Sequence, residues 1–363
     1  MITLKDIAKA TGYSSVSVHR AIYNKEGLKP ETRKKILDTV EAMGYKVNYL
    51  ASSLKRKTIN IAYIGKKPKS AQGYHAQMAK GAHDAFIQFE GMNINCRDYF
   101  FEGKASELED KECDILEEVF NSSEIDGVLI LPIDTSIRMQ LAIQKIIGKG
   151  IPVVLVDDYF DQMDFLCAVA PFYTLAGRTA AEFLGNICKP GKILVSLATA
   201  TSKGTCLNYK GFSQYLKANH PEIQCETVED PFDENLLVDR LVERIDDSVV
   251  GLYSVCERNS PALCKAALKA KRKDLKILGF DLSNEDIQFL KTRVFTGVID
   301  TDPYLQGFLG FRVLLEYMLK NTKPNARILS VPIAVVMHSN LPFFETKRIY
   351  GIHVTDYQSV EMK

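Results

Sequence analysis

The chain has 363 residues, of which 46% are hydrophobic and 25% charged, and its formal net charge is +1. This composition excludes a disordered or fibrous protein. No apolar run approaches the roughly 20 residues needed to cross a bilayer, so we expect no membrane contact. The length suits two or three domains, and the N-terminus lacks the apolar segment of a secretory signal, which favours a cytoplasmic protein.

Neither the cysteines nor the histidines are spaced like a disulfide framework or a metal site. The eight cysteines form no C-x-x-C pair, so we expect buried, reduced thiols. The six histidines lack metal-ligand spacing, and no GxSxG, GxGxxG, HExxH or P-loop pattern occurs. The sequence therefore predicts no metal, no cofactor and no enzymatic activity.

Charge is unevenly distributed along the chain. Residues 1–58 hold 12 lysines and arginines against 5 acidic residues, a charge of +7, which leaves −6 for the remainder. A basic segment attached to a mildly acidic body suits phosphate binding at one end only. The count alone is also compatible with an ordinary solvated surface.

The first residues predict a helix-turn-helix. Thr3 is placed to cap a short helix over residues 4–10, and Ser14 to cap a second helix that ends at Ile22, with Gly12 in the turn between them. In this motif the N-terminal end of the second helix enters the major groove of DNA.

The second helix has two distinct faces. Its inner face, at helical spacing, is predicted to consist of Val18, Ala21 and Ile22. The residues that then point outward are Ser15, Val16, Ser17 and Arg20. Small hydroxyl side chains permit close approach to DNA, and Arg20 offers a guanidinium fork for a phosphate or a guanine edge. The alternative is an ordinary small helical domain.

A third helix and a short helical segment complete the basic region. The helix is predicted from Pro30, with Gly44 as its stop, and its inner face consists of Ile36, Leu37, Val40 and Met43. Residues 47–58 then place Leu50, Ala51 and Leu54 on one side, followed by cations. A helix this short needs a partner to be stable, which fits a minor-groove wedge. A plain interdomain linker is the alternative.

From residue 59 onward, apolar strands alternate with helical patterns. Strands are predicted over 59–65, 127–131, 153–156, 193–197, 251–255 and 277–280, and helices over 78–89, 137–147, 175–187 and 262–271. This alternation predicts parallel sheets covered on both faces, arranged as two doubly wound lobes with a break at 157–171.

Polar residues follow several of these strands, where ligands bind in such sheets. They are Asp134, Asp157, Asp158, Glu257, Arg258, Asp281 and Asp302. Polar groups that meet between two lobes suit a small polar ligand. An aspartate after a strand is, however, often only a helix cap or turn residue.

Together these parts resemble the LacI-type family of bacterial transcription factors, which includes the lactose and purine repressors. The resemblance covers residue 2 to about 344. In the basic region it rests on Ile2-Thr3-Leu4-Lys5-Asp6-Ile7-Ala8, Val18-x-Arg20, Pro30-Glu31-Thr32-Arg33-Lys34-Lys35-Ile36, Met43-Gly44-Tyr45 and Asn48-x-Leu50-Ala51-x-x-Leu54. In the body it rests on Asp126-Gly127-Val128, Gly150-Ile151-Pro152-Val153-Val154, Gly211-Phe212 and Gly279-Phe280-Asp281.

The resemblance implies a small all-α helix-turn-helix domain joined to an α/β periplasmic-binding-protein-like body of two doubly wound parallel-sheet lobes. The expected divisions are the head at 1–46, a hinge helix at 47–58, a body at 59–344 and a C-terminal tail at 345–363, with lobe 1 at about 59–168 and 301–326 and lobe 2 at about 169–300 and 327–344. The family reads double-stranded operator DNA as a homodimer. The implied DNA contacts are Thr3, Leu4, Ser14, Ser15, Val16, Ser17, His19, Arg20, Asn24, Tyr45, Asn48, Leu50, Ala51 and Leu54.

The implied effector contacts are Tyr74, His75, Asp134, Asp157, Asn208, Glu257 and Asp281. The chain departs from the family at Asn208, where arginine is usual, at Glu257-Arg258 in place of Asn-Asp, and at Phe172-Tyr173 in place of Asp-Asn. The segment from Val298 to Gly307 resembles the crossover of periplasmic ribose-binding proteins, which favours a sugar. The predicted function is a repressor gated by a small polar effector. The alternative is a solute-binding protein of a sugar transporter.

Overall fold

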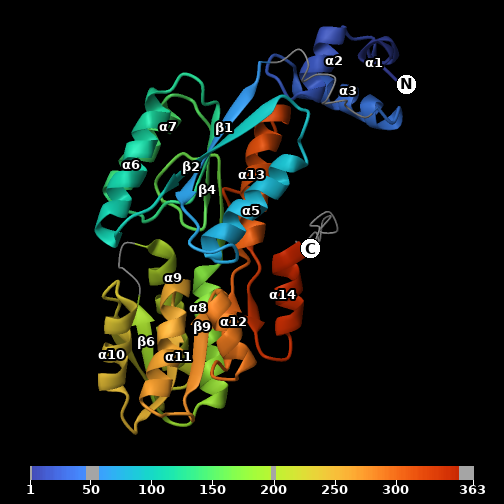
Figure 1. The fold of residues 1–363 in the computed structure, drawn as a ribbon. Helices are drawn as coiled ribbons and strands as arrows, with labels where there is room; N and C mark the ends of the chain where they lie inside the picture. Colours follow the sequence, from blue (N-terminus) through green and yellow to red (C-terminus); the bar gives the residue numbers. More distant parts are fainter. Residues whose placement is uncertain (1, 46–56, 198–201, 351–363) are drawn as a thin grey trace.

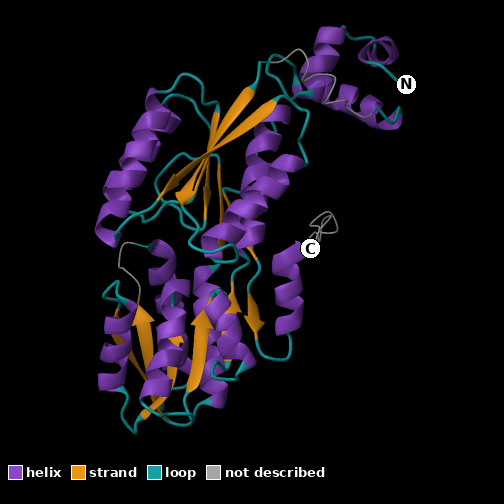
Figure 2. Ribbon diagram, viewed as in Figure 1, coloured by secondary structure: helices purple, strands orange, loops and turns teal. Residues whose placement is uncertain are grey.

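The computed structural model describes residues 2–45, 57–197 and 202–350, which form a helical head followed by two α/β lobes (Figures 1 and 2). The head is residues 2–45. The predicted hinge contacts Asn48, Leu50, Ala51 and Leu54 lie outside the described residues, as does the tail after residue 350. The predicted fold class, a helix-turn-helix domain joined to a two-lobed α/β body, is confirmed.

The head consists of three helices, and both predicted caps are present. The helices are α1 (Leu4–Thr11), α2 (Ser15–Ile22) and α3 (Pro30–Ala42). They enclose a small core whose fully buried members are Ile7, Val18, Ala21 and Ile36. Leu37, predicted on the inner face of α3, is 40% exposed. Its neighbour Ile36 fills the core, and adjacent helical positions point about 100° apart, so both cannot face inward.

Lobe 1 is a six-stranded parallel sheet in the order β11-β5-β4-β3-β1-β2. Its strands are β1 (Ile59–Lys66), β2 (Ile94–Phe101), β3 (Gly127–Ile130), β4 (Val153–Val156), β5 (Cys167–Pro171) and β11 (Ile328–Val331). Its helices are α5 (Tyr74–Ile87), α6 (Ala105–Asn121), α7 (Ile137–Gly148) and α13 (Pro303–Lys320). The first and last of these helices cover one face of the sheet, and α6 and α7 cover the other.

Lobe 2 repeats this plan in the order β12-β10-β9-β8-β6-β7, with β12 antiparallel to β10. Its strands are β6 (Gly191–Leu197), β7 (Ile223–Glu229), β8 (Val249–Ser254), β9 (Lys276–Phe280), β10 (Gly297–Asp300) and β12 (Ala334–Val336). Its helices are α8 (Tyr173–Ile187), α9 (Lys203–Asn219), α10 (Glu234–Arg244), the 3-10 turn η1 (Glu257–Asn259), α11 (Ser260–Lys269), α12 (Asn284–Lys291) and α14 (Leu341–Tyr350).

The chain crosses between the lobes slightly later than expected. Strand β5 keeps the chain in the first sheet through Pro171, not 168, and β11 returns residues 328–331 to that sheet, so the second lobe does not take over at 327. Both strands supply parallel pairing at one edge of the first sheet, because Ile328 to Val331 pair with Ala168 to Pro171. The six predicted strands are all present.

Each lobe brings two helices into backbone contact through glycines. A Cβ on Gly81 of α5 would lie 1.9 Å from the carbonyl oxygen of Tyr304 in α13, and one on Gly307 would lie 2.0 Å from that of Met78. In lobe 2, a Cβ on Gly177 of α8 would lie 1.9 Å from the carbonyl oxygen of Asn208 in α9. These contacts fix how closely the two helices of each pair pack. Among the described residues, no helix is both long and apolar enough to cross a bilayer.

Candidate functional site

Helix α2 is held by a buried inner face and by a cap at its N-terminus, and its outer face is exposed. Ser14 accepts a hydrogen bond from the backbone N–H of Ser17 at 3.1 Å, which satisfies one donor at the helix N-terminus. Val18 is fully buried in the head core. Ser15 and Arg20 are exposed, and Val16 is 62% exposed. The helix therefore presents a row of small side chains and one cation to solvent, as the sequence predicts.

The loop after α2 is fixed by Arg33 of α3. Its guanidinium donates to the carbonyl oxygen of Arg20 at 3.3 Å and to Oδ1 of Asn24 at 2.8 Å, and it also donates to the carbonyl oxygen of Lys25. Asn24 in turn exchanges side-chain-to-backbone hydrogen bonds of 3.1 and 2.9 Å with Asn321, at the end of α13. The predicted DNA contact Asn24 thus lies against lobe 1.

The other predicted DNA contacts of the head divide into exposed and packed residues. Thr3 is exposed and forms a capping box with Asp6. Leu4 and Tyr45 are partly buried and pack against the head core. The rings of His19 and Tyr23 are in tilted contact, with centroids 4.4 Å apart, and partial burial together with Lys25 lowers the pKa of His19. His19 is therefore held beside the exposed row of α2.

A polar cluster joins the two lobes. Tyr173, at the start of α8 in lobe 2, donates a hydrogen bond from its hydroxyl to Asp157, which follows β4 in lobe 1. The buried hydroxyl of Tyr74 has no hydrogen-bond partner of normal geometry within the described residues. Burial raises the pKa of Tyr74, and the nearby Asp157, Tyr173 and Asp281 raise it further. Burial also raises the pKa of Asp157, against the hydrogen bond from Tyr173. Four polar side chains therefore lie close together between the lobes: Tyr74, Asp157, Tyr173 and Asp281.

Three aspartates that follow strands adopt left-handed backbone conformations. The φ angles are +70° for Asp157, +52° for Asp281 and +52° for Asp302. Such conformations are strained for residues other than glycine and concentrate at functional sites. Asp281 is 4% exposed and accepts hydrogen bonds from Thr301, from N at 2.8 Å and from Oγ1 at 2.7 Å. Burial, with Asp300 nearby, raises its pKa well above the ordinary value.

The N-terminus of α9 is docked on the loop after β4. Asp158 of lobe 1 accepts hydrogen bonds from the Ser202 hydroxyl at 3.0 Å and from the Gly204 N–H at 3.2 Å. Lys203 pairs with Asp161 in the same loop. Burial raises the pKa of Asp158 to about 7, although these hydrogen bonds oppose the change. The contact is a direct link between the lobes that sequence reasoning missed, because the two segments are 46 residues apart.

Two further predicted effector contacts line the same region. Asn208 is fully buried, and its Oδ1 accepts a hydrogen bond from the Tyr253 hydroxyl at 2.6 Å, while its Nδ2 has no partner within the described residues. His75 also has a buried ring nitrogen, Nδ1, without such a partner. Burial, with the charges of Lys66 and Lys69, lowers the pKa of His75 to about 3, so its ring is neutral.

The remaining two predicted effector contacts are placed differently. Glu257 of η1 lies near Lys66 of lobe 1 and raises its pKa, against the stronger effect of burial, so it faces across the lobes. Asp134 accepts a hydrogen bond from the Ser136 N–H at 3.0 Å and lies near the buried Glu112 of α6. Asp134 therefore forms a turn before α7, and its role as an effector contact stays a prediction.

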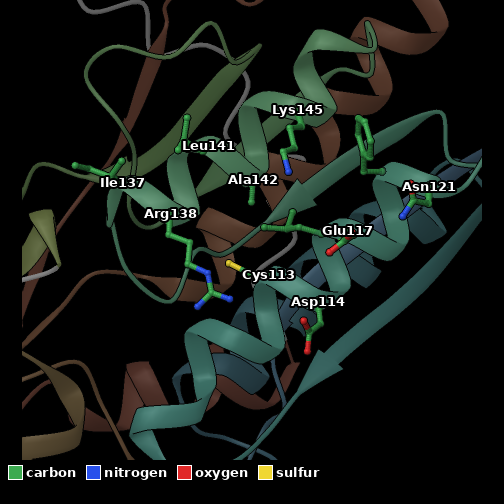
Figure 3. Close-up of a pocket in the computed structure, with 11 residues that line it drawn as sticks. Cys113, Asp114, Glu117, Asn121, Ile137, Arg138, Leu141, Ala142 and Lys145 are labelled. Carbon is green, nitrogen blue, oxygen red and sulfur yellow. The ribbon is translucent and has the colours of Figure 1, made fainter.

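A groove of about 640 Å³ lies between α6 and α7 on the outer face of lobe 1 (Figure 3). Its lining includes the exposed apolar residues Ile137 and Leu141 and the charged residues Asp114, Glu117 and Arg138. These helices cover the face of the sheet opposite α5 and α13. The groove is thus separate from the polar cluster and does not include the predicted effector contacts.

Comparison with known proteins places both parts of the chain. Residues 61–322 match the family described as periplasmic binding protein domain, and residues 3–48 match that described as bacterial regulatory proteins, lacI family. A two-lobed binding fold preceded by a helix-turn-helix defines an effector-responsive DNA-binding protein as the class. The chain belongs to the periplasmic binding protein domain family through its body, and its head is a helix-turn-helix domain of the lacI family.

Curated relatives agree with this assignment, and a solved structure shares the fold of the body. Catabolite control protein A of Priestia megaterium is 22% identical over 329 residues, which cover 88% of this chain and 94% of that protein. The NTD biosynthesis operon regulator NtdR of Bacillus subtilis is 24% identical over 352 residues, which cover 94% and 100%. An Agrobacterium vitis ABC transporter solute binding protein with bound D-fucose shares the fold with a TM-score of 0.71, at 21% identity over 80% of this chain and 99% of that one.

Proposed function

We propose that the chain is a homodimeric repressor of the cytoplasm that grips operator DNA through α2 and senses a sugar or similar polar effector between its lobes. The observation that carries the proposal is the exposed row on α2, with Ser15, Val16 and Arg20 outward while Val18 is fully buried. The N-terminal end of a recognition helix reads base edges in this way. The solute-binding relative with bound D-fucose aligns with 80% of this chain, and the head separates this protein from a transporter component.

The polar cluster between the lobes favours a polyhydroxy effector. Asp157 and Asp281 offer carboxylate oxygens that accept hydrogen bonds from hydroxyl groups, and Tyr74 and Tyr173 add phenol groups. Tyr74 and Asn208 each hold a buried polar atom without a partner in the described part of the chain. Unpaired buried polar atoms cost free energy, so a ligand that hydrogen-bonds to them gains affinity.

An effector bound here would act on the relative position of the lobes. The Tyr173–Asp157 and Gly204–Asp158 hydrogen bonds both span them. The head rests on lobe 1 through Asn24 and Asn321. A ligand that favours one arrangement of the lobes shifts the populations of both arrangements, and with them the placement of two heads on a two-fold symmetric operator.

The test is binding of the full chain to fluorescently labelled DNA from the region upstream of its own gene. We expect a specific complex that survives excess unrelated DNA and weakens steeply with salt. Arg20→Ala should weaken it about five- to a hundredfold, corresponding to about 1–3 kcal/mol. Arg178→Ala removes the same charge from an exposed site on α8 and should change little. The absence of any specific complex would reject the proposal.

The effector is tested by adding single sugars to that complex and, separately, to the protein alone in a thermal-shift screen. A bound sugar should raise the melting temperature by mass action, and Asp281→Asn should abolish that shift. A sugar that shifts melting but leaves DNA affinity unchanged would contradict the proposed coupling, while leaving DNA binding itself intact. Sedimentation of the full chain at micromolar concentration tests the dimer, and a monomer would reject it.

A further inference from the structure

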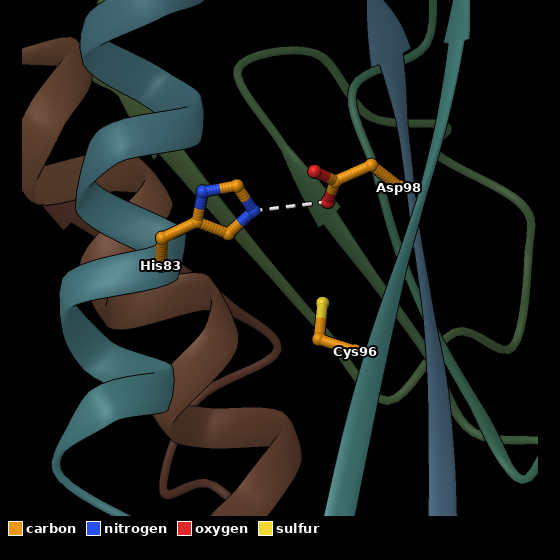
Figure 4. Close-up of side chains that lie close together, drawn as sticks. All are labelled: His83, Cys96 and Asp98. Atoms are coloured by element: carbon orange, nitrogen blue, oxygen red, sulfur yellow. Dashed lines mark hydrogen bonds and ion pairs between the residues drawn. The ribbon is translucent and has the colours of Figure 1, made fainter.

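Three potential metal ligands meet on lobe 1, outside the site described above. Cys96 and Asp98 belong to β2, where residues two apart point to the same face. His83 extends from α5 toward that face, and its Nε2 lies 2.9 Å from Oδ1 of Asp98 (Figure 4). One ligand atom from each of the three residues lies within 4.8 Å of the other two. Figure 4 shows the Cys96 sulfur directed into the same space.

We propose that His83, Cys96 and Asp98 bind a divalent transition metal, with Zn²⁺ as the best match. A thiolate, an imidazole and a carboxylate form the mixed sulfur, nitrogen and oxygen set that Zn²⁺ prefers. Zn²⁺ bonds of about 2.0–2.3 Å in tetrahedral geometry separate such ligands by roughly 3.3–3.7 Å. The Nε2–Oδ1 pair is closer than this and the widest pair extends to 4.8 Å, so shifts of about 1 Å through side-chain rotation suffice.

The surroundings leave these three groups available. The neighbouring carboxylate, Asp84, is already engaged by Lys80 at 2.7 Å and by the Tyr304 hydroxyl at 2.9 Å. Within the described residues, Asp98 forms its ion pair with His83. The side chains of His83 and Asp98 are 41% and 31% exposed, so a metal can enter from solvent. A fourth position remains for water or an outside ligand.

A metal bound here would link helix α5 to β2, the edge strand of the first sheet. Strand β2 is the terminal strand of the first sheet, and α5 packs on its face. Tyr74 and His75, which border the effector region, begin the same helix. The metal would therefore restrain the helix that carries two effector-site residues, and its binding energy would add to the stability of lobe 1.

The test uses the full chain, stripped with a chelator and titrated with Co²⁺, whose thiolate charge-transfer absorption reports a Co–S bond. We expect one Co²⁺ per chain with that absorption, displaced by Zn²⁺, and a higher melting temperature with Zn²⁺. Cys96→Ser should abolish the thiolate band. His83→Gln and Asp98→Asn should each weaken binding by about tenfold or more, since even outer-shell changes cost that much.

Cys225→Ser is the matched control, because this cysteine is also partly buried but lies on β7 of lobe 2. It should leave both the band and the affinity unchanged. Circular dichroism of each stripped variant checks folding, and Asp98 is exposed, so Asp98→Asn keeps the test valid should Cys96→Ser unfold. No thiolate band in the native chain, or an unchanged Co²⁺ affinity in folded Asp98→Asn, would overturn the proposal.

Discussion

The head and the body differ in how their packing is secured. The head closes a core of four fully buried side chains, and its helices are defined by local caps such as Thr3 and Ser14. Each lobe instead presses two helices together at the backbone, through Gly81 and Gly307 in lobe 1 and Gly177 in lobe 2. A core this small contributes only a few kcal/mol to the free energy of unfolding. We therefore expect the head to unfold separately and before the body, whose helix pairs must first separate.

The largest expected effect is Gly177→Ala. Its Cβ would lie 1.9 Å from the carbonyl oxygen of Asn208, so α8 and α9 must move apart. We expect the body to lose about 3 kcal/mol or more, measured by calorimetry of the full chain. Gly148→Ala in α7 meets no atom within 4 Å and should lie between no change and about 1 kcal/mol of stabilisation. Equal melting of the two variants would refute the close-contact argument.

The corresponding change in the head is Ile36→Ala. This side chain is fully buried, and its truncation should cost about 2–4 kcal/mol, which is comparable to the whole stability of a small core. DNA affinity should fall more than tenfold while effector binding by the body is retained. Leu37→Ala, one residue away and 40% exposed, should cost less than about 1 kcal/mol. Loss of effector binding in Ile36→Ala would show that head and body unfold as one unit.

This contrast also explains what could be predicted from the sequence. The helices and caps of the head depend on neighbouring residues, and they were predicted to within two residues. The central strands β1, β3 and β4 are continuous apolar runs buried on both faces, so they were predicted as well. The edge strands β2 and β7 were missed because they contain charged residues and are only partly buried. The short strands β5, β10, β11 and β12, of three to five residues each, were missed as well.

The polar cluster between the lobes was predicted only in part, because its contacts join distant segments. Asp157 and Asp281 follow apolar strands, which made them recognisable. Tyr173 was noted only as a departure from the family, although it hydrogen-bonds to Asp157. The His83, Cys96 and Asp98 cluster was missed too, since the residues come from a helix and a strand. A Cys-x-Asp pair on one strand face was the available signal.

The pH dependence of the body should show an effect that is smaller than these within any one pH unit. The pKa of Asp158 is raised from 3.8 to about 7 by burial, so between these values the folded state holds a proton that the unfolded state has released. The free energy of unfolding should therefore fall as pH rises from about 4 to 7, by up to about 1.4 kcal/mol per pH unit from this group. Asp158→Asn should flatten that slope in urea denaturation at fixed pH values. An identical slope in both proteins would show that Asp158 ionises normally.

The smallest effect separates stability from recognition within α2. Ser14→Ala removes the 3.1 Å hydrogen bond to the Ser17 N–H and should cost the head about 1 kcal/mol, whereas Ser14→Thr keeps a capping oxygen. Ser15→Ala alters an exposed side chain and should change stability by less than about 0.5 kcal/mol, yet it should weaken operator binding more than binding to unrelated DNA. Denaturation and DNA titrations of the three variants decide the matter: if affinity follows stability in all of them, Ser15 has no role in reading bases.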